Sequence, residues 1–295
     1  MNRQKQNVAL VLSGGGARGM AHIGVIEKML EKNLEITSVA GTSIGALVGG
    51  VYASGNLNAF REWVKTQSRM DVIRLMDVVI SRNGFIRGEK VFKELSQFIS
   101  DKNIEDLPIP YAAIAVDIKK HQEIVFTKGK LKDAIRASVS VPTVFKPKLF
   151  NGVELVDGGV LNPLPLDRVM RSDGDQLWAV DLNADIPYKQ PKQNKEQENV
   201  NENYRNALDF INEKWSKYFK SGKQKSSGFF DIITMSVYAM QMKLTEIAIE
   251  KHQPDLLVKI SKTACDLFEF HRSEELINYG KKQLEKALLD KMKES

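Results

Sequence analysis

The segment Gly41-Thr42-Ser43-Ile44-Gly45 carries the residues best suited to covalent chemistry. It has the form G-x-S-x-G and lies between a short apolar run, residues 36–40, and an apolar run typical of a helix, residues 46–52. A strand-to-helix turn of this kind holds the serine hydroxyl outward, and its two glycines relieve steric crowding. A helix beginning at Ile44 also presents unpaired N–H groups near that hydroxyl. Ser43 is therefore predicted to be the nucleophile of a serine hydrolase.

A second glycine-rich turn, Gly14-Gly15-Gly16-Ala17-Arg18-Gly19, follows a predicted strand at residues 8–12. It matches G-x-G-x-x-G, which after a strand and before a helix indicates dinucleotide binding. That fingerprint expects an acidic residue at the end of the second strand, where this chain has Ser43, so nucleotide binding is the weaker alternative. The same turn exposes backbone N–H groups that stabilise an anion, such as the oxygen of a tetrahedral intermediate. Arg18 is expected to hold this loop or to attract an anionic head group, with an ordinary surface charge as the alternative.

A general base is needed beside Ser43, and the four histidines are weak candidates. His252 and His271 come late enough in the chain for a hydrolase triad, but both lie in charged, helix-adjacent contexts. We expect them to be partly exposed or capping residues. His22 falls inside the first predicted helix and is expected to be structural.

Asp157 is the better candidate for the base. It follows an apolar strand at residues 153–156 and precedes Gly158-Gly159, which allow a sharp turn beside another segment of backbone. Simple turn chemistry is the alternative, and it would be preferred if this motif stood alone. The presence of the two other glycine-containing turns favours a functional aspartate.

The elements that must position these residues are predicted from hydrophobic periodicity. Apolar runs that alternate with helical patterns indicate a mainly parallel sheet covered on both faces by helices. Strands are expected at residues 8–12, 36–40, 111–116, 123–126, 153–156, 177–182 and 256–260. Helices are expected at residues 20–32, 46–52, 88–100, 131–137 and 229–249, and within 57–79.

Composition restricts the class of protein. The chain has 295 residues, of which 42% are hydrophobic and 27% charged, as in a soluble protein with a sizeable core. The net charge of +6 permits contact with an anionic membrane without requiring it, and no nucleic-acid partner is expected. The single Cys265 fits a reducing compartment. Neither a secretory signal nor an apolar window of about 20 residues is present, so we expect a cytoplasmic protein able to lie at the inner membrane surface.

Residues 189–227 differ from the rest of the chain in being polar and basic. A helical face within them carries Trp215 and Phe219, with Lys214, Lys217 and Lys220 beside it. The ordinary interpretation is a surface helix packed on the domain. The alternative is an interfacial helix that lays its aromatic residues into an anionic membrane surface.

In combination, these blocks resemble the motifs of bacterial patatin-like phospholipases. The resemblance spans residues 8–182 and rests on four blocks in this order: residues 14–19, 41–45, 137–147 and 157–159. It implies a three-layer α/β/α fold with a mainly parallel central sheet, and a Ser-Asp dyad without histidine. By this resemblance Ser43 is the nucleophile and Asp157 the base. Gly14, Gly15, Gly16 and Arg18 would form the oxyanion hole.

The resemblance also implies a lipid acyl ester, such as a phospholipid or lysophospholipid, as the substrate. No cofactor is implied, and the sequence shows no cluster with metal-ligand spacing. We expect a single domain with its catalytic core at about 8–182, an insertion at 189–227 and a C-terminal helical extension at 228–295. A non-catalytic regulatory or membrane-binding protein that retains the fold is the remaining alternative.

Overall fold

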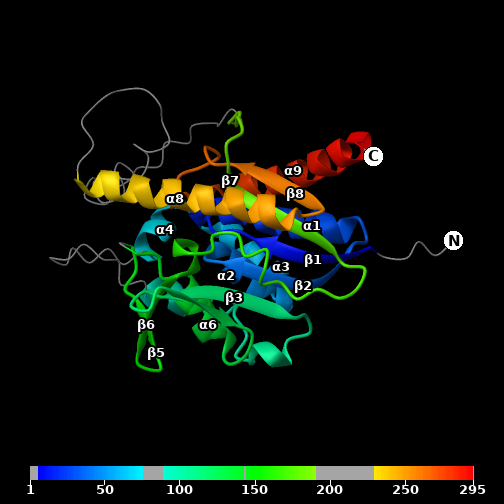
Figure 1. Ribbon diagram of the computed structural model, residues 1–295. Coiled ribbons are helices and arrows are strands. Elements are labelled where there is room, and N and C mark those ends of the chain that lie inside the picture. The colour runs from blue at the N-terminus through cyan, green and yellow to red at the C-terminus, as the bar shows by residue number, and fades with distance from the viewer. Residues whose placement is uncertain (1–5, 76–88, 143, 191–228, 295) are drawn as a thin grey trace.

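A computed structural model describes residues 6–75, 89–142, 144–190 and 229–294 of the chain. Its centre is an eight-stranded sheet (Figure 1). Five strands pair in parallel in the order β3-β2-β1-β7-β8, and β4, β5 and β6 add antiparallel pairs beside β3. The predicted, mainly parallel sheet is confirmed. The strands are β1 (Asn7–Leu12), β2 (Glu35–Thr42), β3 (Tyr111–Asp117), β4 (Gln122–Phe126), β5 (Lys148–Phe150), β6 (Val153–Asp157), β7 (Gln176–Ala184) and β8 (Leu256–Ser261).

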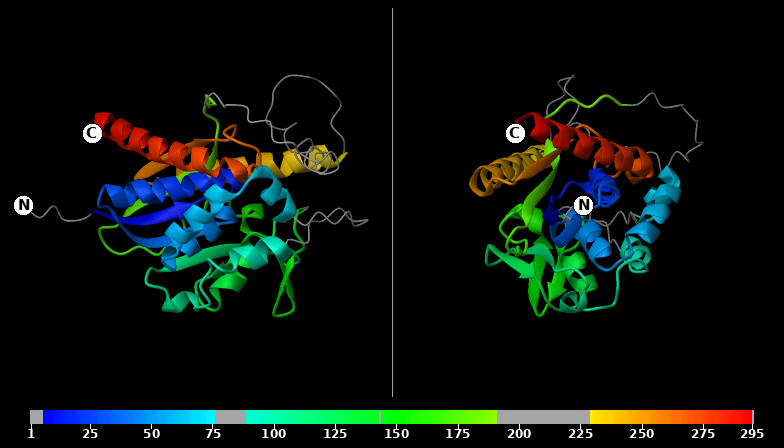
Figure 2. Two further views of the ribbon diagram at one scale, coloured as in Figure 1. Left: turned by 180° about the vertical axis from the view of Figure 1, so that it is seen from behind. Right: turned by 90° about the vertical axis from the view of Figure 1, so that its right-hand side faces the viewer.

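Helices lie on both faces of this sheet, as the end-on view of Figure 2 shows, with α8 on one side and α1 and α9 on the other. The three-layer arrangement predicted from the sequence is therefore present. The α-helices are α1 (Met20–Glu31), α2 (Ile44–Ala53), α3 (Leu57–Thr66), α4 (Arg69–Leu75), α5 (Glu89–Leu95), α6 (Leu131–Ser138), α8 (Phe229–His252) and α9 (Ser273–Glu294). Short 3₁₀ turns are η1 (Gly16–Gly19), η2 (Ile104–Asp106), η3 (Gly158–Val160) and η4 (Phe270–Arg272).

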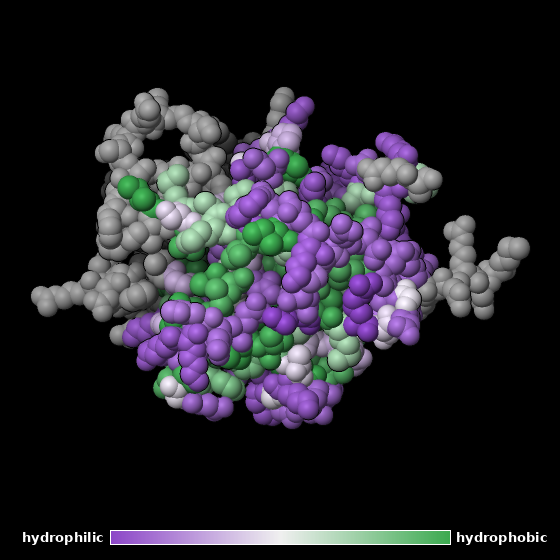
Figure 3. All heavy atoms as spheres, viewed as in Figure 1, coloured by the Kyte–Doolittle hydropathy of each residue, from purple (hydrophilic) through white to green (hydrophobic). Residues whose placement is uncertain are grey.

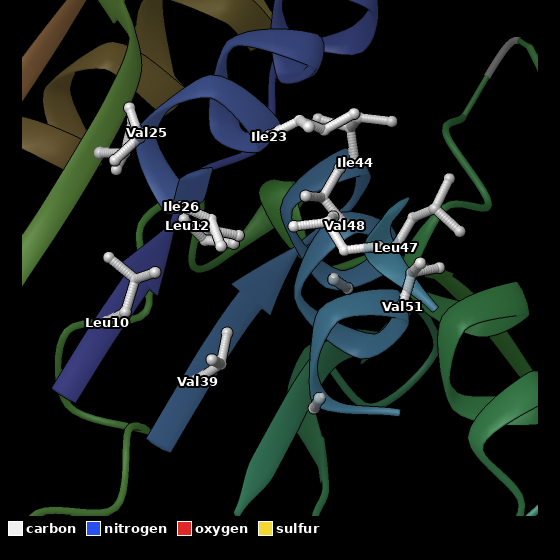
Figure 4. Packing of buried hydrophobic residues seen from close by; sticks show 14 of the residues in the cluster. Leu10, Leu12, Ile23, Val25, Ile26, Val39, Ile44, Leu47, Val48 and Val51 are labelled. Carbon is white, nitrogen blue, oxygen red and sulfur yellow. The ribbon is translucent and has the colours of Figure 1, made fainter. Parts of the chain in front are cut away.

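The central strands carry apolar side chains on both faces because helices cover both faces of the sheet. Successive side chains of a strand point to opposite faces, so Leu10 and Leu12 of β1 join the larger core while Val11 joins the smaller one. Figure 4 shows the larger core, where Leu10, Leu12 and Val39 of the sheet lie near side chains of α1 and α2. The smaller core includes Leu164 and Leu177, with Ala248 of α8 packed against it. This packing fixes the carboxyl ends of β1 and β2, where both glycine turns begin.

The segment after residue 228 contributes to the sheet as well as adding helices. β8 pairs in parallel with β7, and α9 lies along α1. The two helices approach closely at glycines. A Cβ on Gly24 would lie 1.8 Å from the carbonyl oxygen of Ile277, and one on Gly280 would lie 2.1 Å from that of Ala21. Contact between the backbones thus holds α9 against the core.

We predict that Gly24→Ala lowers the free energy of unfolding. Alanine improves intrinsic helix propensity by about 1 kcal/mol, but its methyl group would collide with the α9 backbone, and overpacking of a core costs about 1–3 kcal/mol. Urea unfolding of the wild type and the variant measures the net effect. Lys282→Ala, at an exposed position of α9, is the control and should change stability by less than about 0.5 kcal/mol. Equal stability of Gly24→Ala and the wild type would contradict the close packing.

Candidate active site

Ser43 occupies the turn predicted from the G-x-S-x-G motif. β2 ends at Thr42 and α2 begins at Ile44, and Ser43 between them has φ 58° and ψ −124°. A non-glycine residue in this region is strained by about 1–3 kcal/mol, which is a common feature of functional sites. Close packing of the turn requires glycine at position 45, since a Cβ there would lie 2.2 Å from the carbonyl oxygen of Leu12.

The register of β3 brings Asp157 next to this turn. Thr42 at the end of β2 pairs with Ile114, and the next residue of β3, Ala115, pairs with Asp157 at the end of β6. The next residue, Gly158, lies so close to β3 that a Cβ on it would be 2.4 Å from the carbonyl oxygen of Ile114. Ser43 and Asp157, which are 114 positions apart in the sequence, therefore lie at the ends of strands that both pair with β3.

The Asp157 carboxyl group is buried, with 5% of the residue exposed. Its Oδ1 accepts a hydrogen bond of 2.7 Å from the N–H of Gly159. Its Oδ2 is buried without a hydrogen bond of standard geometry. Burial raises the pKa of Asp157 to about 6, and the nearby Ser43 hydroxyl and the Gly159 N–H oppose part of that rise. The result is a carboxyl group that is more basic than an exposed aspartate.

Two serines of the 137–147 block accept hydrogen bonds from the backbone of Ser43 and of Asp157. Ser138 Oγ accepts a hydrogen bond of 2.9 Å from the N–H of Ser43. The carbonyl oxygen of Ser140 accepts one of 3.0 Å from the N–H of Asp157. Both serines are fully buried. The sequence of this block indicates its importance only through the resemblance to a family and does not predict these contacts.

The glycine-rich turn lies directly beside Ser43. A Cβ on Gly14 would lie 3.3 Å from the Cβ of Ser43. The Gly14 N–H donates to the carbonyl oxygen of Pro163 at 3.1 Å, so it is not available to a ligand. Among the described residues, neither Gly15 N–H nor Gly16 N–H has a hydrogen bond assigned to it. Of the three glycines proposed as oxyanion donors, the geometry favours these last two.

Arg18 is 1% exposed, so the alternative of a surface charge is wrong. Its guanidinium donates to the carbonyl oxygens of Leu182, Lys262 and Cys265 at 3.0–3.3 Å and to Asn183 Oδ1 at 2.9 Å. Asn183 Nδ2 in turn donates to the carbonyl oxygen of Gly14 at 2.9 Å. These contacts favour the loop-holding role over binding of an oxyanion or a head group.

A cavity of about 270 Å³ opens at Ser43 and Asp157. This volume is near the lower end of the range for small-molecule sites, about 300 Å³. Most of its wall is apolar, and its phenylalanine and tryptophan residues come from α3, α5 and the segments that follow α6 and β8. They are Phe60, Trp63, Phe92, Phe145, Phe268 and Phe270. Such a wall suits an acyl chain.

All four histidines fall within the described residues, and none lines this cavity. His22 is fully buried in α1, where burial lowers its pKa to about 4 and its Nε2 lies 2.9 Å from the carbonyl oxygen of Ser13. It is therefore a neutral structural residue, as predicted. His252 and His271 are partly exposed.

Helix α8 supplies cavity residues that the sequence analysis did not identify. Val237, Tyr238 and Gln241 line the wall nearest to η3. Tyr238 donates to Asn183 Oδ1 at 3.1 Å, which links α8 to the glycine turn. The spacing of these residues on one helix face was visible in the sequence, but nothing local related that face to Asp157. The predicted membrane residues Lys214, Trp215, Lys217, Phe219 and Lys220 lie outside the described residues, and their role stays a prediction.

The fold and this site define a class of protein. A family model described as patatin-like phospholipase matches residues 10–170, more than half of the chain. The chain belongs to the patatin-like phospholipase family. Membership supports lipid-hydrolase activity in general.

Individual relatives agree with this assignment. An uncharacterised NTE family protein of Mycobacterium bovis is 31% identical over 95% of this chain and 91% of its own length. Patatin-like phospholipase domain-containing protein 6 of Homo sapiens is 33% identical over 60% of this chain, which corresponds to 13% of that protein. The crystal structure of VipD from Legionella pneumophila covers 93% of this chain and 67% of its own at 13% identity, with a TM-score of 0.42, a similarity too distant to carry an argument.

The described part of the chain contains no group of three or more histidine, cysteine or acidic side chains placed to bind a metal ion. None of its helices combines the length and apolarity needed to cross a membrane.

We predict that Arg18→Lys lowers the free energy of unfolding and the hydrolytic rate together. A lysine cannot supply all four hydrogen bonds, and a buried acceptor left without a donor costs about 1–3 kcal/mol. Urea unfolding and ester hydrolysis measure the two effects. Arg74→Lys, at a largely exposed position of α4, is the matched control. Unchanged stability with a higher KM for anionic lipids would instead assign Arg18 to head-group binding.

Proposed function

We propose that the protein is a serine acyl hydrolase that cleaves lipid acyl esters, phospholipids or lysophospholipids, through an acyl-Ser43 intermediate. The observation that carries the proposal is the position of Ser43 beside the buried carboxyl group of Asp157, at a mainly apolar cavity. Family membership favours this function over the dinucleotide-binding alternative. A non-catalytic protein with the same fold is the alternative that the experiments below address.

In the acylation step, Ser43 Oγ attacks the ester carbonyl carbon and Asp157 Oδ2 accepts the hydroxyl proton. Oδ2 suits this role because it is buried and has no hydrogen bond of standard geometry. The negative charge that develops on the carbonyl oxygen is stabilised by Gly15 and Gly16 N–H, aided by the positive end of α2. Collapse of the intermediate breaks the bond to the alcohol. The alcohol leaves with the proton held by Asp157.

In the deacylation step, a water molecule takes the place of the alcohol. Asp157 accepts its proton as the water oxygen attacks the acyl carbon, and the same N–H groups stabilise the second oxyanion. Collapse releases the fatty acid and returns the proton to Ser43 Oγ. The Asp157 carboxyl group thus serves as base and then as acid in both acylation and deacylation. An ester suits this mechanism better than an amide because an alcohol leaves more readily than an amine.

We predict that an organophosphonate ester labels Ser43 and that Ser43→Ala abolishes both labelling and turnover. Loss of a nucleophile costs hydrolases about 10⁴-fold or more in kcat. Peptide mass mapping locates the adduct, and assays with lysophospholipid and short-chain esters measure turnover. Ser54→Ala, at the end of α2, is the matched control because its hydroxyl bonds only the carbonyl oxygen of Val51. Intact turnover in Ser43→Ala would refute the nucleophile, and a wild type that is inactive on both substrates would favour a non-catalytic protein.

We predict that kcat/KM rises with pH through an apparent pKa of about 6. Asp157 must be ionised to accept a proton, and burial raises its pKa to about 6. A pH–rate profile from pH 4.5 to 8.5 measures this. The rate of phosphonate labelling should follow the same curve, since it requires the same base. A rate that is flat across pH 5–7 would contradict the assignment.

Because the pKa of Asp157 is raised, we predict that Asp157→Asn changes how the stability of the fold depends on pH. A carboxyl group whose pKa is higher in the folded state stabilises the fold fully below its unfolded pKa of about 4. That contribution is lost as pH rises through about 6. Asp157→Asn keeps the acceptor for Gly159 N–H, so the inactive variant should match the wild type near pH 4 and exceed it in stability at pH 8. A variant that unfolds at pH 8 would contradict this account.

A further inference from the structure

Gln241 of α8 lies at the candidate dyad although it is far from every motif in the sequence. It lines the cavity together with Val237 and Tyr238, which are four and three residues before it on the same face of the helix. α8 packs against η3, the turn that follows Asp157. Residue 241 also lies well beyond residues 10–170, to which the family model matches.

The Gln241 amide lies close to the turn that follows Asp157. A Cβ on Gly159 would lie 3.0 Å from Asp157 Oδ1 and 3.1 Å from Gln241 Nε2. The carboxyl group and the amide therefore border the same point above the turn, and glycine at position 159 keeps that point open. Both groups, like Ser43, line the cavity.

Three amide side chains line the cavity, and two of them are already hydrogen-bonded. Gln67 Nε2 donates to the carbonyl oxygen of Trp63 at 3.0 Å. Asn183 donates to Gly14 and accepts from Arg18 and Tyr238. Within the described residues, the Gln241 amide makes no hydrogen bond and is half-buried. Its donors and its acceptor are available to a ligand.

Two groups of side chains in the cavity wall differ in polarity in a way that suits an ester. Phe60, Trp63 and Phe92 of α3 and α5 are aromatic and fit the acyl chain. Asn183, Tyr238 and Gln241 are polar; Tyr238 donates to Asn183, and Gln241 lies next to the turn that follows Asp157. In Figure 3 hydrophobic surface is visible over part of α8, where Ile232, Met235 and Met240 are exposed, and charged residues such as Lys243 and Glu246 share the outer side of this helix. Arg18, the cationic residue in the described lining, is occupied by backbone carbonyl groups.

We propose that Gln241 hydrogen-bonds the leaving alcohol of the lipid ester and so determines how well that alcohol is accepted. This inference rests on the proposed function and adds a specificity-determining residue from outside the motif region. A neutral amide can both donate to and accept from a hydroxyl group, and it can donate to an ester oxygen. A hydrogen bond from Gln241 therefore favours a leaving alcohol with further hydroxyl groups, such as the glycerol part of a lipid. It gives no advantage to a leaving group that has no further hydroxyl group.

Two octanoyl esters with different leaving groups test the proposal. Monooctanoylglycerol and p-nitrophenyl octanoate form the same octanoyl-Ser43, so deacylation is identical. Comparing each variant with the wild type on the same ester cancels the different reactivity of the two leaving groups and isolates the contact made to each of them. Gln241→Met should lower kcat/KM for the glycerol ester by about 3- to 10-fold, the effect of one neutral hydrogen bond, and leave the p-nitrophenyl ester unchanged. Gln67→Met, the same chemical change at an amide already hydrogen-bonded, should leave the ratio of the two substrates unchanged. An equal loss on both esters, or no loss on either, would overturn the proposal.

A binding measurement separates this inference from the proposed function. In a Ser43→Ala background, calorimetry with 1-O-octylglycerol, an ether that cannot be cleaved, reports the contact without turnover. Adding Gln241→Met should weaken its binding by about 3- to 10-fold, and equal binding would overturn the contact. A wild type that cleaves neither ester and does not react with a phosphonate would overturn the proposed function instead.

Discussion

The pairing register of β3 is the constraint on which the candidate site depends. One residue of β3 faces the end of β2 and the next faces the end of β6. Ser43 and Asp157 are the residues at those two ends. Because strand pairing sets this register with many backbone hydrogen bonds, a side-chain contact is not needed to bring the two groups together. A slip of one residue on either side would turn one of them to the opposite face of the sheet.

The glycines of the site serve close approach more than flexibility. Positions 45 and 158 pass within van der Waals distance of neighbouring backbone carbonyl groups, where a Cβ has no room. Gly16 combines such crowding with a positive φ of 59°. The buried Arg18 then holds the turn by donating to carbonyl groups of β7 and of the segment that follows β8. These bonds occupy the Arg18 guanidinium and leave the N–H groups of Gly15 and Gly16 as the donors of the turn without a hydrogen bond among the described residues.

Sequence patterns predicted the core of this arrangement because its signals are local. The apolar run of β1, the turn at Ser43 and the Asp-Gly-Gly turn each lie within about ten residues, and the structure has a strand or a turn at each of these places. The short strand β5, at residues 148–150, was missed because three residues carry no periodicity. The environment of Arg18 could not be predicted, since its acceptors lie 164 or more residues away. Gln241 could not be identified for a similar reason, since 84 residues separate it from Asp157 and its neighbours depend on how α8 packs against the sheet.

The sheet order also has a consequence for biosynthesis. β1 and β2 leave the ribosome first, but their neighbours β3 and β7 follow only after roughly 70 and 135 more residues have been made. Parallel pairing across such distances forms slowly. During that interval the chain holds the proposed nucleophile without its base and without the walls of the acyl cavity. A nascent or truncated chain would therefore carry an inert serine, and the ability to attack lipids would arise only when the last elements of the fold have closed around it.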